Sequence, residues 1–409
     1  MFRLLSLDLQ DIGPFEKAHL DFATEEPRIT ILTGENGTGK SILLDAIRIG
    51  LGSQYAHLSR DIRRTKDWVI SLNALFRDRS HNLSASRDSM RGSGQNFSIG
   101  GIETVRQVPH GVVHQGHAPE FVADFWSAVA LSGPAKIQGL TTIRPVDAFE
   151  QPLAGDYESA SVVRLLANFD YLRTSELESE RKVGERLFSM AKRIVELSLL
   201  EDGELVAIRR ADFTPIVRQA GREVPLENLS SGNAYLIQRM ISLLGKMYSV
   251  HVLAGTPPEE IGKTPGFLLI DEAENHLHPK WQKRFLRNIL ELFPNLQIIA
   301  ATHSPFIVAS VPGARVYVCK YDHEKQRCYV EKQEDVSSRP VDEILMSGVF
   351  DETQPFNEEI TKLIEERQQA MERGDQEARR VVEAKLLKLN PQHFAYFKVD
   401  DMMASLGLR

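Results

Sequence analysis

The sequence is poor in cysteine and contains no long apolar run. Its two cysteines, Cys319 and Cys328, do not form a C-x-x-C motif, which excludes a zinc site built from cysteine pairs. No stretch reaches the roughly 18 apolar residues of a transmembrane helix. The N-terminus alternates in polarity and carries Asp8, unlike a signal peptide. We therefore expect a cytoplasmic chain with no membrane partner and with free thiols, although a tight turn at His323 and Glu324 would place the cysteines opposite each other.

An excess of positive charge is also lacking. The formal net charge of −7 over 409 residues excludes a protein that binds nucleic acid through its overall charge. The segment from Arg60 to Arg106 differs, because it contains nine Lys or Arg and only five Asp or Glu. This segment fits either a surface that contacts a nucleic-acid backbone or an ordinary solvated, loop-rich face.

The most informative stretch is rich in glycine and ends in Lys-Ser. It matches G-x-x-x-x-G-K-[ST], the loop that holds phosphates. An apolar, β-branched run precedes it and a helical pattern follows it, as the motif requires. We predict that it binds ATP through backbone N–H groups at a helix N-terminus, and through Lys40, with Ser41 as a ligand of Mg²⁺. The predicted nucleotide-binding residues are Gly34, Glu35, Asn36, Gly37, Thr38, Gly39, Lys40 and Ser41.

Two acidic residues follow a short apolar run, Phe267 to Ile270. A buried parallel strand would deliver Asp271 and Glu272 to the sheet edge that also carries the phosphate loop. A carboxylate such as Asp271 suits Mg²⁺, and Glu272 suits the general base for an attacking water. The predicted catalytic set is completed by Lys40 and by His303, which ends the next apolar strand and could contact a γ-phosphate.

Three other features of the sequence allow more than one interpretation. Ser230, Ser231 and Gly232 precede a helix, with Ser230 as a candidate N-cap, and present N–H groups at its N-terminus. His276 and His278 lack the further ligands of a zinc site. Phe15, near a turn, could contact an adenine ring or simply pack in the core.

Four elements in one order resemble a known family: the phosphate loop, Leu-Ser-Ser-Gly, Leu-Leu-Ile-Asp-Glu and Ala-Thr-His-Ser-Pro. The chain resembles the ABC-type ATPase heads of the structural-maintenance, RecF-like and overcoming-lysogenization-defect families. The resemblance implies that two heads dimerise head to tail, with Ser230, Ser231 and Gly232 of one copy closing on ATP held by the other. Residues Asn275 to His278 would lie at the dimer seam. The family's glutamine is not obvious, and Gln138 is a weak match.

The expected fold is an α/β ABC-ATPase head with a mixed central sheet. We expect five segments: the first core part (1–53), an antiparallel β lobe (54–120), core re-entry with a helical insertion (121–225), the second core part (226–335) and a charged helical extension (336–409). The extension should be a helical hairpin broken at Gly374 and Asp375, with an apolar stripe that serves either packing or a partner, and a third helix from Gln392 to Leu406.

Within this superfamily, the absence of a long heptad arm argues against a condensin-like protein. The compact head is similar to the Septu-type ATPase, which works with a separate HNH nuclease and also occurs in some retron systems. We therefore expect an ATP-hydrolysing switch that forms a homodimer or a higher even oligomer and regulates a nuclease in anti-phage defence. The alternatives are a DNA-binding ATPase of repair or recombination and a scaffold that hardly hydrolyses ATP.

Overall fold

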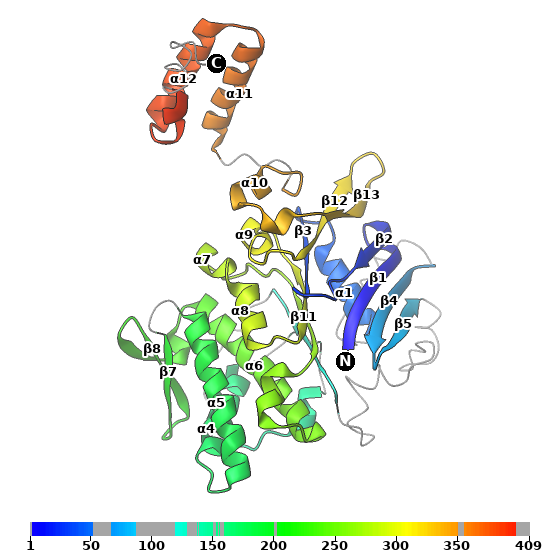
Figure 1. The fold of residues 1–409 in the computed structure, drawn as a ribbon, viewed down its shortest axis with the longest axis vertical. Coiled ribbons are helices and arrows are strands. Elements are labelled where there is room, and N and C mark those ends of the chain that lie inside the picture. Colours follow the sequence, from blue (N-terminus) through cyan, green and yellow to red (C-terminus); the bar gives the residue numbers. More distant parts are fainter. Residues whose placement is uncertain are drawn as a thin grey trace. The chain divides into compact units, whose positions relative to one another are not determined.

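The computed structural model describes residues 2–51, 67–86, 119–128, 137, 139–149, 153, 155, 159–199, 203–350 and 356–397 (Figure 1). The chain divides into two compact units, Met1–Val341 and Asp342–Arg409. Within the described ranges, no helix is long and apolar enough to cross a membrane.

The first unit is built on one large mixed sheet. In the described residues it has ten strands in the order β5-β4-β1-β2-β13-β12-β3-β11-β10-β6. The strands are β1 (Phe2–Ile12), β2 (Phe15–Asp21), β3 (Ile29–Gly34), β4 (Val69–Phe76), β5 (Arg79–Ser86), β6 (Val122–Trp126), β10 (Gly266–Ile270), β11 (Leu296–Ala301), β12 (Arg315–Asp322) and β13 (Arg327–Gln333).

The two halves of this sheet differ in strand direction and burial. Strands β12, β3, β11, β10 and β6 run parallel to one another. Every residue of β3, β6, β10 and β11 is buried, which explains their continuous apolar runs. In β4, by contrast, buried and half-buried residues alternate, as in a sheet with one covered face. The predicted α/β class with a mixed central sheet is confirmed.

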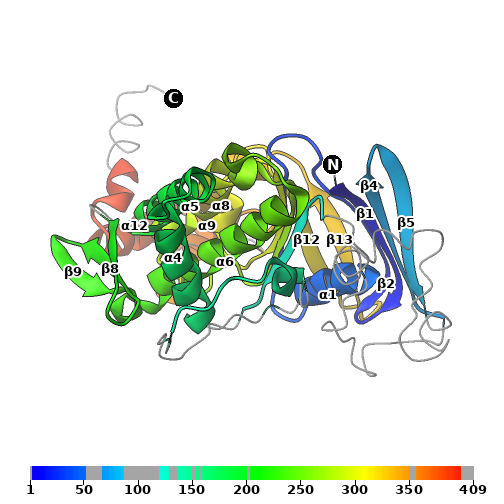
Figure 2. The same cartoon turned by 90° about the horizontal axis from the view of Figure 1, so that it is seen from below.

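Helices cover both faces of the sheet (Figure 2). Helix α1 (Lys40–Gly50) packs its apolar side against the curled antiparallel strands, and its Leu43, Leu44 and Ile47 share a core with β1 and β4. The other helices of the first unit are α4 (Ser159–Arg173), α5 (Glu178–Ser198), α6 (Ser231–Ala254), α7 (Pro279–Gln282), α8 (Phe285–Leu292) and α9 (Pro305–Val308). Helix α10 (Val341–Leu345) begins at the last residue of the first unit and otherwise belongs to the second.

A small antiparallel sheet follows helix α5. It consists of β7 (Glu204–Arg209), β8 (Thr214–Gln219) and β9 (Arg222–Pro225). Ala220 and Gly221 both have positive φ, 51° and 72°, which gives the tight hairpin turn predicted from the sequence.

Strands β4 and β5 pair antiparallel with each other and continue the main sheet beyond β1, within the segment 54–120 for which the sequence predicts an antiparallel β lobe. Two short strands expected at 97–99 and 105–108 lie outside the described residues, as does most of the basic segment from Arg60 to Arg106. Residues 279–292 form the two helices α7 and α8 and not one continuous helix. The reason is a tighter turn, in which the N–H of Arg284 donates to the carbonyl of Trp281, three residues back.

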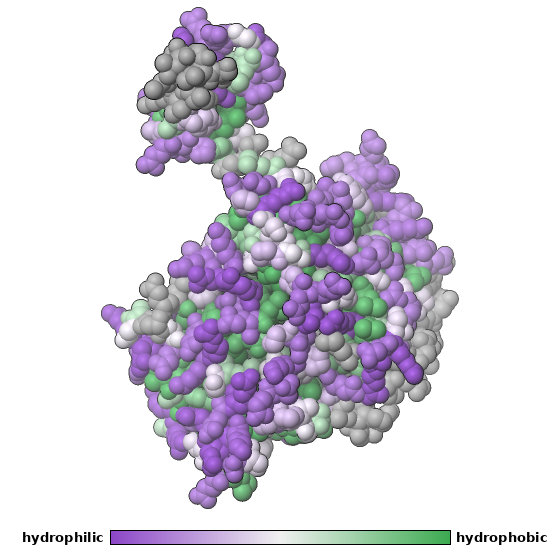
Figure 3. All heavy atoms as spheres, viewed as in Figure 1, coloured by the Kyte–Doolittle hydropathy of each residue, from purple (hydrophilic) through white to green (hydrophobic). Residues whose placement is uncertain are grey.

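The second unit contains the predicted helical hairpin. Helix α11 (Glu358–Glu372) ends before Gly374, which has a φ of 70°, and Asp375 caps α12 (Gln376–Leu389). Leu363, Val382 and Leu386 pack with Phe394 and Phe397 in the core of the unit. These stripe residues therefore serve packing. The unit shows a mainly hydrophilic surface in Figure 3. Where the third helix was expected, residues 393–395 form a 3-10 turn and residues 396–397 are helical, while 398–409 lie outside the described residues.

The cysteines lie on the β12–β13 hairpin but do not face each other. Cys319 pairs with Val330, and Cys328 pairs with Tyr321. The register differs from the predicted one because the loop is longer: Asp322 pairs with Arg327, and its carboxylate accepts hydrogen bonds from two backbone N–H groups of the turn. Both thiols are free and buried, as expected, and burial raises the pKa of Cys319 to about 12.

This burial leads to a prediction about thiol reactivity. The folded chain should not react with a thiol reagent at pH 8, because both sulfurs are shielded and the thiolate of Cys319 is disfavoured. Both should react in denaturant. Counting modified thiols by mass spectrometry tests this, and fast labelling of either cysteine in the folded chain would contradict it.

Candidate functional site

The glycine-rich loop connects the end of β3 to the start of α1. Gly34 has a φ of 132°, and a Cβ there would lie 2.2 Å from the carbonyl oxygen of Cys319. A Cβ on Gly39, at φ 94°, would lie 2.6 Å from the ring of Phe15. Since L-residues with a side chain rarely adopt such φ values, both glycines are required for the shape of the loop. Phe15 is fully buried beneath the loop, so the structure favours its packing role over an adenine contact.

Lys40 is the first residue of helix α1, and its side chain lies under the phosphate loop. Its Nζ donates hydrogen bonds to the carbonyls of Gly34, at 2.9 Å, and Glu35, at 2.7 Å. Burial lowers the pKa of Lys40 below its usual value. The loop is further closed by the Thr38 hydroxyl, which donates to the Glu35 carbonyl at 2.8 Å. A buried cation at a helix N-terminus favours a negatively charged ligand.

Strand β10 brings the two predicted acids to the same sheet edge. Asp271 follows it directly, and the Ser41 hydroxyl donates to Asp271 Oδ1 at 3.1 Å. Burial raises the pKa of Asp271 above its usual value. A neighbouring cation would reverse this effect, because it stabilises the ionised carboxylate. The hydroxyl and carboxylate oxygens of this pair are the donors that Mg²⁺ prefers.

Glu272 occupies a left-handed backbone conformation, with a φ of 48°. Its Oε2 accepts a hydrogen bond from Asn275 Nδ2 at 2.7 Å, and the same amide donates to the carbonyl of Ala128 at 2.9 Å. A non-glycine residue in this conformation costs about 1–2 kcal/mol, so neighbouring contacts must hold it. Asn275 ties the carboxylate to the segment that follows β6.

Strand β11 supplies the third part of the site. It ends at Ala301, and Thr302 and His303 follow. Burial, followed by the charge of Lys40, lowers the pKa of His303. The carboxylate of Glu274 accepts hydrogen bonds from the Thr302 hydroxyl and from the His303 N–H, both at 2.6 Å.

These elements line one cavity of about 240 Å³. Its lining residues are Asn36, Gly37, Gly39, Lys40, Ser41, Ile42, Asp271, Glu272, Ala301, Thr302 and His303. The structure thus brings together the predicted catalytic and metal-binding residues. Sequence reasoning missed Asn275 as a partner of Glu272, and missed Glu274 altogether. The only sequence signal for Glu274 and Asn275 was that they are polar residues two and three positions after Glu272.

The second glycine-containing loop does not line this cavity. The Ser230 side chain accepts a hydrogen bond from the Asn233 N–H at 3.5 Å and caps α6, as predicted. Ser231 is exposed, whereas Gly232 is buried, and a Cβ on Gly232 would lie 2.1 Å from the carbonyl oxygen of His276. His278 accepts a hydrogen bond from the Lys280 N–H and caps α7. Gln138 lies outside the described residues.

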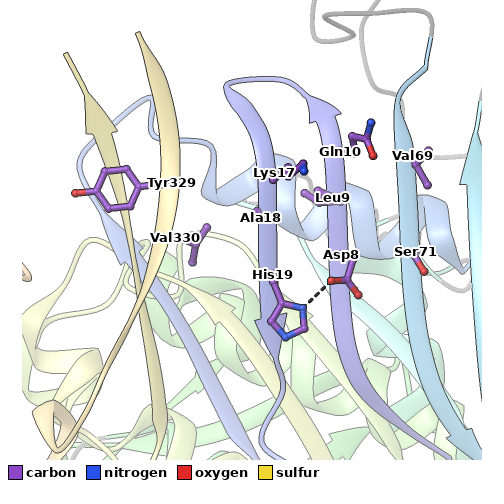
Figure 4. A pocket seen from close by; sticks show the side chains of 10 residues that line it. All are labelled: Asp8, Leu9, Gln10, Lys17, Ala18, His19, Val69, Ser71, Tyr329 and Val330. Atoms are coloured by element: carbon purple, nitrogen blue, oxygen red, sulfur yellow. Dashed lines mark hydrogen bonds and ion pairs between the residues drawn. The ribbon is translucent and has the colours of Figure 1, made fainter. Parts of the chain in front are cut away.

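A larger hollow, of about 460 Å³, lies on the outer strands β1, β2, β4 and β13 (Figure 4). It opens where β2 and β13 share a single residue pair. His19 Nδ1 and Asp8 Oδ1 lie 2.6 Å apart there, and this hydrogen bond raises the pKa of His19. The hollow contains no residue of the phosphate loop, so its size does not make it the candidate site.

Comparisons with known proteins agree with this geometry. A family model described as "AAA domain, putative AbiEii toxin, Type IV TA system" matches residues 138–309, and a second AAA domain model matches residues 6–97. The chain is 26% identical to a retron Vc95 probable ATPase of Vibrio cholerae serotype O1 biovar El Tor over 49% of this chain and 38% of that protein. It is 33% identical to a Septu protein PtuA of Bacillus thuringiensis over 25% of each chain.

The chain thus spans less than half the length of these relatives. Among solved structures, an SMC head domain from Thermotoga maritima is 16% identical, with a TM-score of 0.42, over 81% of this chain and 99% of that one.

The close contact at Gly34 leads to a prediction about stability. Gly34→Ala should lower the free energy of unfolding by about 2–4 kcal/mol, because the new methyl group meets the β12 backbone. Gly37→Ala is the matched control, since Gly37 also has a positive φ but has no atom within 4 Å of its Cβ position. It should cost about 1–2 kcal/mol. Urea denaturation measures both, and equal losses would contradict the proposed contact.

Proposed function

We propose that the chain is an ATPase that binds ATP with Mg²⁺ and hydrolyses the nucleotide as a molecular switch, and the AAA domain models that match residues 6–97 and 138–309 support this proposal. The observation that carries this proposal is the single cavity in which Lys40, Ser41, Asp271, Glu272 and His303 meet. They come from the ends of three neighbouring parallel strands, and no second constellation of this kind was found among the described residues.

The roles follow from the chemistry of each group. Lys40 would hold the β- and γ-phosphates, whose oxygens would replace the carbonyls of Gly34 and Glu35 as its hydrogen-bond acceptors. Ser41 and Asp271 would hold Mg²⁺, which neutralises charge on the phosphates. Catalysis would then consist mainly of positioning and charge stabilisation.

Glu272 would act as the general base that orients and deprotonates the attacking water. Its carboxylate is already tied to Asn275 at 2.7 Å, which restricts its direction. Burial, followed by the charge of Lys40, lowers the pKa of His303, which favours the neutral ring with one N–H that could donate to a γ-phosphate oxygen. Because Glu272 is the proposed base, we assign positioning and transition-state stabilisation to His303.

We further propose that two copies bind head to tail. Ser230, Ser231 and Gly232 lie at the N-terminus of α6, where N–H groups favour anions, yet they do not line their own chain's phosphate cavity. This placement supports a role toward ATP bound to a second copy. Dimerisation would then depend on ATP, and hydrolysis would release it.

The names of the relatives suggest where such a switch acts. They are a retron probable ATPase and a Septu protein, and we propose that this chain regulates a separate effector, a nuclease, in anti-phage defence. The competing proposal is a DNA-binding ATPase, which rests on the basic segment between Arg60 and Arg106.

A substitution at the proposed base tests the switch. Glu272→Gln should abolish most ATP turnover, by about 100-fold or more, while ATP binding persists, because the amide cannot accept the proton. The variant should accumulate as an ATP-bound dimer. Turnover by phosphate release and mass by light scattering, with and without ATP, are the measurements.

Two further variants complete this experiment. Glu324→Gln makes the same chemical change on the exposed β12–β13 turn and should behave like the native chain. Lys40→Ala should lose nucleotide binding itself. Native turnover in Glu272→Gln would refute the role of Glu272, and retained nucleotide affinity in Lys40→Ala would refute the phosphate-loop assignment.

The two cellular roles predict different partners. A tagged chain purified from its native cell should carry a stoichiometric effector protein if it regulates a defence complex. A DNA-binding ATPase should instead bind DNA when ATP is present, with an affinity that falls steeply with salt. Absence of a bound protein together with salt-sensitive DNA binding would replace the defence proposal with the second one.

A further inference from the structure

One carboxylate joins two loops of the candidate site. Glu274 follows β10 by four residues and uses both of its oxygens on the segment after β11. Oε2 accepts from the Thr302 hydroxyl and Oε1 accepts from the His303 N–H, each at 2.6 Å. Such short hydrogen bonds to an ionised acceptor are about twice as strong as neutral ones.

The surroundings of Thr302 make this link specific. Thr302 is fully buried, and its oxygen also accepts a hydrogen bond from the Ser304 N–H at 3.0 Å. Its single hydroxyl proton is therefore directed to Glu274. Without Glu274, this buried hydroxyl would lose its hydrogen-bond acceptor.

The same loop carries Glu272, two residues before Glu274. The Ala273 N–H donates to the carbonyl of Ala301 at 2.9 Å, so the two loops are joined by backbone and side chain together. Glu272 keeps its left-handed conformation inside this bridge. The bridge consequently fixes the separation between Glu272, the proposed base, and the backbone of His303, the proposed γ-phosphate contact.

We propose that Glu274 is a positioning residue for ATP hydrolysis, which holds Glu272 and His303 at the spacing required for the reaction. The proposal rests on the proposed function described above. Glu274 is not itself a base, because both of its oxygens are engaged with Thr302 and His303. Its contribution should therefore appear in the catalytic step and not in nucleotide affinity, since its partners lie outside the phosphate loop.

Four variants separate positioning from general structural support. Glu274→Ala removes both hydrogen bonds and should lower kcat by about 10- to 100-fold, the cost expected from a misplacement near 1 Å. Its KM for ATP should stay within about 3-fold of the native value. Glu274→Gln keeps the shape and one acceptor and should restore part of kcat. Thr302→Val removes one of the two bonds and should have a smaller effect, whereas Thr302→Ser keeps the hydroxyl and should lose less activity than Thr302→Val.

The measurements are steady-state ATP turnover, equilibrium binding of a fluorescent ATP analogue and the melting temperature, all on the full chain. Native kcat in Glu274→Ala would overturn the inference. A loss of kcat matched by an equal loss of ATP affinity would also overturn it, because it would indicate a purely structural role. If Glu274→Ala does not fold, the other three variants still test the inference. It predicts that kcat decreases in the order Thr302→Ser, Glu274→Gln, Thr302→Val. A native chain without Mg²⁺-dependent turnover would instead refute the proposed function itself.

Discussion

The parallel register of three strands is the constraint on which the site depends. Backbone pairing aligns Ala301 with Leu32 and Ala300 with Ile270. This alignment brings the carboxyl ends of β3, β11 and β10 to one edge of the sheet. At that edge the phosphate loop follows β3, Thr302 follows β11 and Asp271 follows β10. The pairing is protected from water because every residue of the three strands is buried. A small set of backbone hydrogen bonds therefore positions groups that lie more than 200 residues apart in the sequence, such as Ser41 and Asp271.

The predictable parts of the molecule were those with strong local signals. Continuous apolar runs identified β3, β10 and β11, and the Gly-Lys-Ser ending identified the loop and the start of α1. The partners of strands were not predictable in this way. Alternating residues in β4 indicate a strand with one covered face, yet they do not reveal that β4 pairs with β1 and so extends the main sheet. The length of a loop also affects strand pairing. The loop after Asp322 is longer than expected, and it shifts the pairing of Cys319 by two residues from the expected register.

The side-chain contacts within the site were harder to predict from the sequence than the strand pairing. Asp271, Glu272 and His303 were recognisable because each lies within two residues of the end of a buried strand. Glu274 and Asn275 were not, because their functions depend on hydrogen bonds to residues 28 and 147 positions away along the chain. Each supports a neighbour that the sequence does identify: Asn275 contacts Glu272, and Glu274 contacts the backbone of His303. Local patterns thus indicate the groups that would meet the nucleotide, whereas the groups that orient them depend on the tertiary fold.

The Gly232 contact connects this network to the surface that we assign to the dimer. A Cβ on Gly232 would collide with the carbonyl of His276, so the start of α6 rests directly on the loop that carries Glu272, Glu274 and Asn275. Packed backbone segments cannot move independently over such a distance. In the head-to-tail arrangement proposed above, the segment that touches a partner's ATP is therefore in contact with the loop that would hydrolyse the chain's own ATP. The contact between Gly232 and the carbonyl of His276, four residues after Glu272, therefore places the two proposed sites side by side within one chain.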